Sequence, residues 1–211
     1  CSKAKQQEGT STDDGRIKVV TTIFPQYDFV RQIAGGRADL KMLLKPGEES
    51  HSYEPTPQDI IAIQNCDLFI YVGGENDEWV EDILSSMDTG RMATLRLVDC
   101  VDTVEEEHVE GMKGNHREEE ENQGEDDEHV WTSPKNAVKI VYNITELLCR
   151  ADVENADAYK RDAETYIHKL EDLDAQFRQV VEESDRDTIL FGDRFPFRYF
   201  ADEYGLRYYA A

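Results

Sequence analysis

The 211-residue sequence predicts an α/β fold with an open, mostly parallel sheet and helices on both faces. Runs rich in β-branched residues alternate along the chain with segments whose apolar residues recur at helical spacing. The run from Leu68 to Val72 is apolar throughout, as expected for a strand that is covered on both faces. The regular alternation of strand and helix implies right-handed crossovers, which make the strands parallel.

Turn and capping residues set the boundaries of the elements. Pro25 begins the first helix, Gly35 ends it, and Thr56 with Pro57 forms the cap and first turn of the second. The predicted strands span residues 16–23, 40–44, 68–72, 92–98, 187–191 and 206–210. The predicted helices span residues 25–34, 57–63, 78–87, 134–149, 153–183 and 195–204. The fifth of these helices, with roughly thirty residues, would be a rod of about 45 Å.

Composition limits both the size of the core and the choice of partners. With 39% hydrophobic and 33% charged residues, the chain can bury one substantial core, or one complete lobe and part of a second. A net charge of -23 argues against nucleic-acid binding, because a polyanion would be repelled, and it favours cations as small partners. No apolar run approaches the roughly 18 residues that span a bilayer.

Residues 99–128 are dominated by acidic side chains. Such a charge block cannot bury enough apolar surface to order itself, so it is predicted to form a mobile loop. Two interpretations are open. The loop either collects cations beside a binding cleft, where its charge raises their local concentration, or is simply a solvated connection.

Two histidines lie on proline-bounded loops, each between a strand-like and a helix-like run. His51 lies in the segment 47–57 and His129 in the segment 126–134. A single loop histidine is more often exposed or a capping residue than a ligand. However, the ends of parallel strands commonly build sites, so two such loops indicate one shared site. Neutral imidazoles combined with carboxylates suit a divalent ion such as Zn²⁺ or Mn²⁺.

Four segments resemble, in register, the metal-binding receptors of ABC importers, a family of zinc and manganese solute-binding lipoproteins that includes the lipoprotein adhesins. The segments are residues 17–25, 51–59, 65–71 and 129–137. The resemblance extends from about residue 17 to the last residue. It implies an extracytoplasmic, monomeric receptor that captures Zn²⁺ or Mn²⁺ as transported ligand and delivers it to an ABC permease.

The resemblance also implies a two-lobed architecture. Residues 16–150 would form the N-terminal lobe, 151–184 a long connecting helix, and 185–211 the start of a C-terminal lobe that is incomplete in this chain. In the family such a helix holds the lobes at a nearly fixed angle, which predicts limited hinge closure.

The chain departs from the family at the third histidine, because Arg194 falls where that residue would be. Arginine does not bind metal ions, so the site must differ. The neighbouring Asp193 either supplies an oxygen ligand or pairs with Arg194. The predicted ligands are therefore His51, His129 and Asp193, with both imidazoles oriented by acceptors that the sequence does not identify.

Cysteine positions carry two expectations. Cys1 and the polar tether over residues 1–15 are typical of a lipoprotein anchored outside the cell membrane through lipid on the cysteine, although an arbitrary chain boundary would look the same. Cys66, Cys100 and Cys149 lack metal-type spacing and define no disulfide.

Two other functions compete with the receptor hypothesis. A metallohydrolase could use a histidine and carboxylate site to activate water, but no H-E-x-x-H or G-x-S-x-G motif accompanies the histidines. A surface adhesion module could use the acidic loop as its contact. We predict a metal-binding receptor and not an enzyme.

Overall fold

The computed structural model describes residues 15–45, 47–48, 50, 53–74, 77–105, 126–192 and 195–210. A four-stranded, entirely parallel sheet in the order β2-β1-β3-β4 forms the centre of the first lobe. Its strands are β1 (Ile17–Thr21), β2 (Ala38–Met42), β3 (Leu68–Tyr71) and β4 (Ala93–Arg96). The predicted parallel α/β sheet is thus confirmed. Strands β1, β3 and β4 are one to three residues shorter than predicted, whereas β2 begins and ends two residues earlier than predicted.

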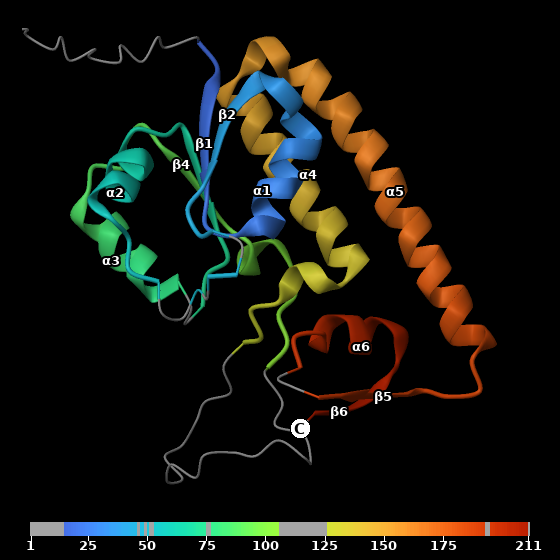
Figure 1. Ribbon diagram of the computed structural model, residues 1–211. Helices are drawn as coiled ribbons and strands as arrows, with labels where there is room; N and C mark the ends of the chain where they lie inside the picture. The colour runs from blue at the N-terminus through green and yellow to red at the C-terminus, as the bar shows by residue number, and fades with distance from the viewer. Residues whose placement is uncertain are drawn as a thin grey trace, which may run out of the picture.

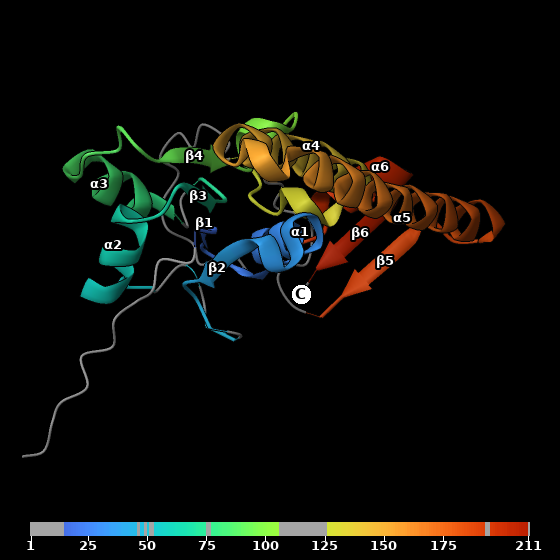
Figure 2. The ribbon, with the colours of Figure 1, turned by 90° about the horizontal axis from the view of Figure 1, so that it is seen from above.

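Helices cover both faces of this sheet, as Figures 1 and 2 show. One face is covered by α1 (Phe24–Ala34), α4 (Pro134–Ala151) and α5 (Ala156–Glu183), and the other by α2 (Pro57–Gln64) and α3 (Glu78–Ser86). Successive strand residues point to opposite faces, so Val19 packs in the first layer and Val20 in the second. Both faces of β3 are therefore buried, which explains its unbroken apolar sequence.

Local capping fixes where the helices at the site begin. The Thr56 side chain accepts a hydrogen bond from the backbone N–H of Asp59, and the Asp59 carboxylate accepts one from the N–H of Thr56. This reciprocal capping box satisfies two N–H groups at the start of α2. The Ser133 hydroxyl similarly caps α4, which begins at Pro134.

The connecting helix α5 has 28 residues and is about 42 Å long. It runs from the first lobe to the C-terminal elements (Figure 1). Its first half packs on α1 and α4 through Tyr159, Ala163, Ile167 and Leu170, which are all buried.

The predicted end of this helix at Glu183 is confirmed, but its predicted start is three residues too early. Val153–Asn155 is a 3-10 turn, in which the Asp152 side chain accepts from the N–H of Asn155. In the second half of the helix the apolar residues are partly in solvent, with Leu173 39% and Val180 65% exposed. The helix extends past the first lobe there and has less surface to pack against.

The C-terminal elements form a small β-α-β unit. It consists of β5 (Thr188–Phe191), α6 (Arg198–Tyr204) and β6 (Arg207–Ala210), with the two strands parallel. Phe195 stacks on Tyr208 with ring centroids 3.9 Å apart. Phe177 of α5 meets Phe200 of α6 edge-on at 4.9 Å, which joins the unit to the connecting helix.

The segments that flank the acidic stretch are ordered, which corrects the prediction of a mobile loop over all of residues 99–128. Val98–Cys100 is a 3-10 turn, and Glu105 pairs with Asp126 in an antiparallel bridge. The N–H of Asp127 also donates to the carbonyl of Val104 at 2.8 Å. Backbone pairing therefore joins the two ends of the loop. The rest of the acidic stretch, residues 106–125, lies outside the described part.

Among the described residues, no helix has the length and apolar character needed to cross a bilayer. The three cysteines in that part, Cys66, Cys100 and Cys149, are not joined by disulfides. Cys66 is buried, and this burial raises the pKa of its thiol to about 12. It therefore acts as a small apolar core residue. Cys1 and the predicted tether lie outside the described residues.

Candidate metal centre

His129 lies directly before a short 3-10 turn, η5 (Val130–Thr132), which leads into α4. The carbonyl of His129 accepts hydrogen bonds from the backbone N–H of Thr132 at 3.1 Å and from its hydroxyl at 2.8 Å. These two bonds fix the direction in which the chain leaves His129.

The Asp127 carboxylate holds both the backbone and the ring of His129. Its Oδ1 atom accepts from the backbone N–H of His129 at 2.7 Å and lies 3.0 Å from the ring Nδ1. The Asp127 side chain is 5% exposed, whereas that of His129 is 41% exposed. Because a carboxylate oxygen accepts, the ring proton belongs on Nδ1, and a metal ion would be bound through Nε2.

The neighbours of His129 place it beside the turn that follows β3. The adjacent Glu128 packs against Gly74, where an added Cβ atom would lie 2.3 Å from the Glu128 carboxylate. Gly74 also has a φ of +86°, a conformation that side chains other than glycine rarely adopt. On its other side, His129 contacts Trp131 with ring centroids 5.6 Å apart.

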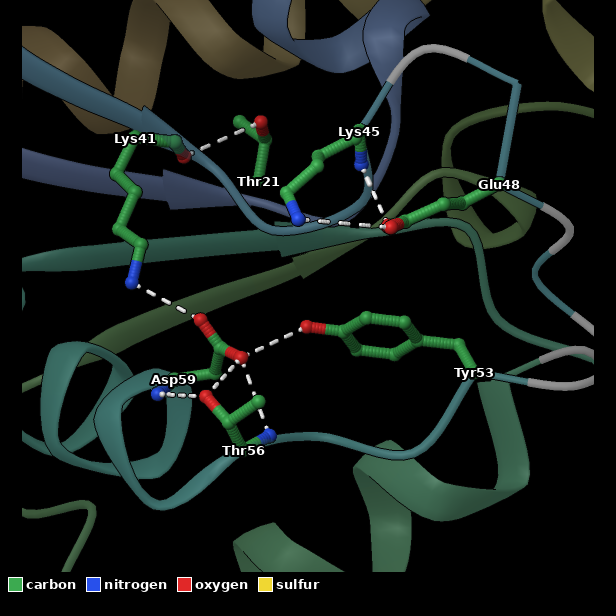
Figure 3. A network of polar contacts seen from close by, with 7 residues as sticks. All are labelled: Thr21, Lys41, Lys45, Glu48, Tyr53, Thr56 and Asp59. Atoms are coloured by element: carbon green, nitrogen blue, oxygen red, sulfur yellow. Dashed lines mark hydrogen bonds and ion pairs between the residues drawn. The ribbon is translucent and has the colours of Figure 1, made fainter.

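The predicted first loop is anchored by a polar network around Asp59, which Figure 3 shows. The Asp59 carboxylate accepts from the Tyr53 hydroxyl at 3.0 Å, from the Thr56 hydroxyl at 2.6 Å and from Nζ of Lys41 in β2 at 3.0 Å. Burial opposes ionisation of Asp59, but the hydrogen bonds from Thr56, Lys41 and Tyr53 outweigh it and lower its pKa to about 2. The ionised carboxylate thus ties the loop to the strand and to α2.

Both loops leave from the carboxyl edge of the sheet. After β2, the N–H groups of Leu43 and Leu44 donate to the carbonyls of Thr21 and Thr22 at the end of β1. Tyr53 then packs edge-on against Trp79, just beyond the turn after β3, with ring centroids 5.3 Å apart. The first loop therefore packs on α3, the helix that follows the turn contacted by Glu128.

Three of the predicted site residues, His51, Asp193 and Cys1, lie outside the described part, as does Arg194, and their roles stay predictions. Within the described residues, no group of three or more histidine, cysteine, aspartate or glutamate side chains is placed to hold a metal ion. Glu54, a possible carboxylate neighbour, is exposed. His168 lies on the surface of α5, with its Nδ1 atom 3.1 Å from the Glu171 carboxylate.

An apolar cavity of about 660 Å³ lies beside η5, where the first lobe meets the C-terminal unit. It is lined by α1, α5 and the aromatic side chains of the C-terminal unit, and by Trp131 and Pro134 from the His129 segment. The lining side chains that the structure describes are mostly apolar, with Asp28 the only carboxylate among them, so by themselves they would not hold a divalent ion. The predicted ligand Asp193 lies in the sequence between Phe191 and Phe195, which line the cavity, but is itself outside the described residues.

Asp127 and Asp59, which hold the His129 segment and the first loop through hydrogen bonds, were not identified as such from the sequence. Asp127 lies in a run of acidic residues that all look alike, so nothing in composition distinguishes it. Its spacing two residues before His129 is typical of an aspartate that bonds the backbone N–H two residues on, and that signal could have found it.

A parallel α/β lobe with an oriented histidine at its carboxyl edge, joined by one long helix to a second α/β unit, defines a two-lobed metal-receptor fold. The chain belongs to the ZnuA family, described as periplasmic component A of the zinc-uptake complex, whose model matches residues 19–211. The predicted family is thereby confirmed.

Two relatives show the extent of the match. The zinc-binding protein AdcA of Streptococcus pyogenes serotype M3 is 34% identical over 201 residues, covering 92% of this chain and 39% of that protein. The high-affinity zinc uptake system protein ZnuA of Bacillus subtilis is 33% identical over 210 residues, covering 98% of this chain and 64% of that protein. The chain thus spans between 39% and 64% of the length of these relatives. Since the relatives are named as binding or uptake proteins, the prediction that the chain is not an enzyme is confirmed.

Solved structures agree on the fold. The metal-dependent lipoprotein YcdH of Bacillus subtilis matches with a TM-score of 0.78 and 32% identity, over 92% of this chain and 67% of that one. Zn(II)-bound AdcA of Streptococcus pneumoniae matches with a TM-score of 0.78 and 28% identity, over 93% of this chain and 39% of that one.

Proposed function

We propose that this chain captures zinc outside the cytoplasmic membrane and delivers it to the permease of an ABC importer. The observation that carries the proposal is the contact between Asp127 and the Nδ1 atom of His129. Metal-ligating histidines commonly donate their second ring N–H to a carboxylate, which fixes the tautomer and increases the basicity of the ligating nitrogen.

The proposed ligands are His51, His129 and Asp193. Two imidazoles and a carboxylate suit zinc, which prefers few ligands in tetrahedral geometry, whereas manganese favours more oxygen ligands. The names of the relatives, zinc-binding and zinc uptake proteins, support zinc as the transported ion. The net charge of -23 favours the approach of any cation.

Attachment to the membrane through lipid on Cys1 is part of the proposal. A relative that is named a lipoprotein supports it: the zinc-binding lipoprotein AdcA of Streptococcus pneumoniae strain R6, which is 30% identical to this chain over 213 residues. The receptor would act as a monomer that presents zinc to its permease.

Titration calorimetry of the 211-residue chain and three histidine variants tests the ligand assignment. His129→Ala and His51→Ala should each weaken zinc binding at least tenfold, which corresponds to about 1.4 kcal/mol. His168→Ala is the matched control, because His168 is an exposed histidine on α5 beside Glu171 and is not a proposed ligand, so this variant should bind zinc like the wild type. Wild-type affinity in the His51→Ala/His129→Ala double variant would contradict the proposed site.

The choice of metal has its own test. Zinc should displace Mn²⁺ in competition, and zinc affinity should fall as the pH drops through about 6.5, where protons compete for an unperturbed imidazole. A preference for manganese would show that oxygen ligands dominate the site.

A further inference from the structure

The hydroxyl of Tyr199 joins the two backbone segments at the base of the acidic loop. Tyr199 lies on α6 and is 5% exposed. Its hydroxyl donates to the carbonyl of Asp127 at 2.6 Å and lies 3.4 Å from the N–H of Val104, which donates to it. With the Asp127 N–H bonded to the Val104 carbonyl at 2.8 Å, the three residues form a closed ring of hydrogen bonds.

This ring fixes the residue that orients His129. The N–H of Asp127 bonds to Val104, its carbonyl accepts from Tyr199, and its Oδ1 atom binds both the backbone and the ring of His129. A shift of the Asp127 backbone would therefore move the carboxylate that holds the imidazole. The Tyr199 hydroxyl, from the C-terminal unit, is one of the groups that prevent this shift.

The hydroxyl has a role distinct from that of the ring. The Tyr199 ring belongs to the hydrophobic core of the first lobe, so a phenylalanine could replace its packing. Without the hydroxyl, however, the buried carbonyl of Asp127 would lose this donor, and unpaired buried polar groups are costly. Burial raises the pKa of Tyr199 to about 12, so the hydroxyl stays protonated and remains a donor at neutral pH.

We propose that Tyr199 is a positioning residue for metal capture, which acts through Asp127 on His129 and makes zinc affinity depend on the contact between α6 and the first lobe. The inference rests on the proposed role of His129 as a zinc ligand. By the same route, zinc held at His129 stabilises the contact of α6 with the base of the loop.

Tyr199→Phe and Tyr204→Phe form a matched pair that separates positioning from stability. Tyr204 is also on α6 and 8% exposed, but its hydroxyl donates to Asp174 of α5 at 2.8 Å and not to Asp127. Both variants should lose thermal stability. In calorimetry, only Tyr199→Phe should weaken zinc binding. The expected loss of affinity is about tenfold, at the lower end of the losses found when a group that orients a metal ligand is removed.

A double variant tests the route of the effect. If Tyr199 acts through Asp127, adding Tyr199→Phe to Asp127→Ala should weaken zinc binding no further. Additive losses of affinity would show that Tyr199 influences zinc by another path, and would overturn the inference.

The ring of His129 offers a readout that needs no metal. In the metal-free wild type, the ¹⁵N chemical shifts of His129 should show the tautomer protonated at Nδ1, and Tyr199→Phe should shift the population away from it while Tyr204→Phe does not. Unchanged tautomer and unchanged zinc affinity in Tyr199→Phe would refute the positioning role. If His129→Ala binds zinc like the wild type, the proposed ligand fails, whereas the tautomer measurement still decides whether Tyr199 positions the ring.

Discussion

The four-stranded lobe and the C-terminal β-α-β unit differ in how completely they pair and bury their strands. In the first lobe, β3 is paired on both edges and covered on both faces, so Leu68, Phe69 and Ile70 are all 0% exposed. In the C-terminal unit, within the part of the chain that the structure describes, the two strands pair only with each other, and Leu190 is 80% exposed and Tyr209 43% exposed. Strand β3 of the first lobe is thus buried in a core on both faces. The C-terminal unit is instead held by the packing of its own helix α6 and by aromatic contacts with α5.

The more completely packed region can hold binding residues rigidly. His129, its partner Asp127 and the Asp59 network all lie on the first lobe. Among its described residues, the C-terminal unit contributes the buried hydroxyl of Tyr199, and the proposed ligand Asp193 would also come from this unit. A site held within about 0.5 Å needs supporting groups that are themselves locked by packing. The first lobe provides that support.

The largest expected effect contrasts the cores of the two regions. Phe69→Ala should destabilise the chain by about 3–5 kcal/mol, because it removes a fully buried ring that stacks on Tyr71 at 5.5 Å. Leu190→Ala on the exposed face of β5 should change stability by no more than about 0.5 kcal/mol. Chemical denaturation of both variants measures the difference. Equal losses would show that the two regions share one core.

A smaller effect is expected at the polar anchor of the first loop. Asp59→Asn should cost about 1–3 kcal/mol, because a neutral amide cannot replace a carboxylate that accepts from Tyr53, Thr56 and Lys41. Since the pKa of Asp59 is lowered from 3.8 to about 2, the wild type keeps this stabilisation above about pH 4 and loses it as the pH falls toward 2. Denaturation curves between pH 2 and 7, in steps of about one pH unit, measure both the loss and its pH range.

The C-terminal unit supplies the control for this variant. Asp187 pairs with Arg207 at 2.7 Å, but both side chains are more than half exposed, so solvent screens their attraction. Asp187→Asn should therefore have a smaller effect than Asp59→Asn. A larger effect at Asp187 would reverse the ranking of the two regions.

Most of the fold could be predicted from the sequence because each element carries a local signal. Thr56 and Pro57 mark the start of α2 through capping, and the apolar run of β3 marks a strand buried on both faces. The burial of α5 could not be predicted over its whole length. Leu173 and Val180 continue the helical apolar pattern, yet their exposure depends on how far the helix extends past the lobe, which is a tertiary property.

A site residue could be predicted from the sequence where a metal-binding residue type lies in a segment that also carries a local structural signal. His129 stands out because it lies between an acidic run and a helix start at Pro134. The contact of Tyr199 with Asp127 joins residues 72 positions apart, and no periodic pattern in the sequence indicates it. His51 stays a prediction for the calorimetry to decide, and Asp193 also stays a prediction.

Within the first lobe, Asp77 is expected to have the opposite pH dependence to Asp59, with only a small effect on stability at alkaline pH. Asp77 is 2% exposed, and burial together with the charge of Glu128 raises its pKa to about 6, despite hydrogen bonds from the N–H groups of Gly73 and Val72. The folded state therefore binds a proton more tightly than the unfolded state, so this group contributes less stability as the pH rises from about 4 to about 6.

Asp77→Asn should remove that slope and change stability at pH 8 by less than about 1 kcal/mol, since relief of the buried charge is offset by weaker hydrogen bonds to a neutral amide. The free energy of unfolding of wild type minus variant, measured from pH 4 to 8, should fall and then level off above about pH 6. Asp82→Asn on the exposed side of α3 should reproduce the wild-type curve. A difference that rises with pH would contradict this prediction. It would mean that the two backbone N–H groups stabilise the charge of Asp77 more than burial opposes it. The turn after β3 would then favour the ionised carboxylate, as the Asp59 network does.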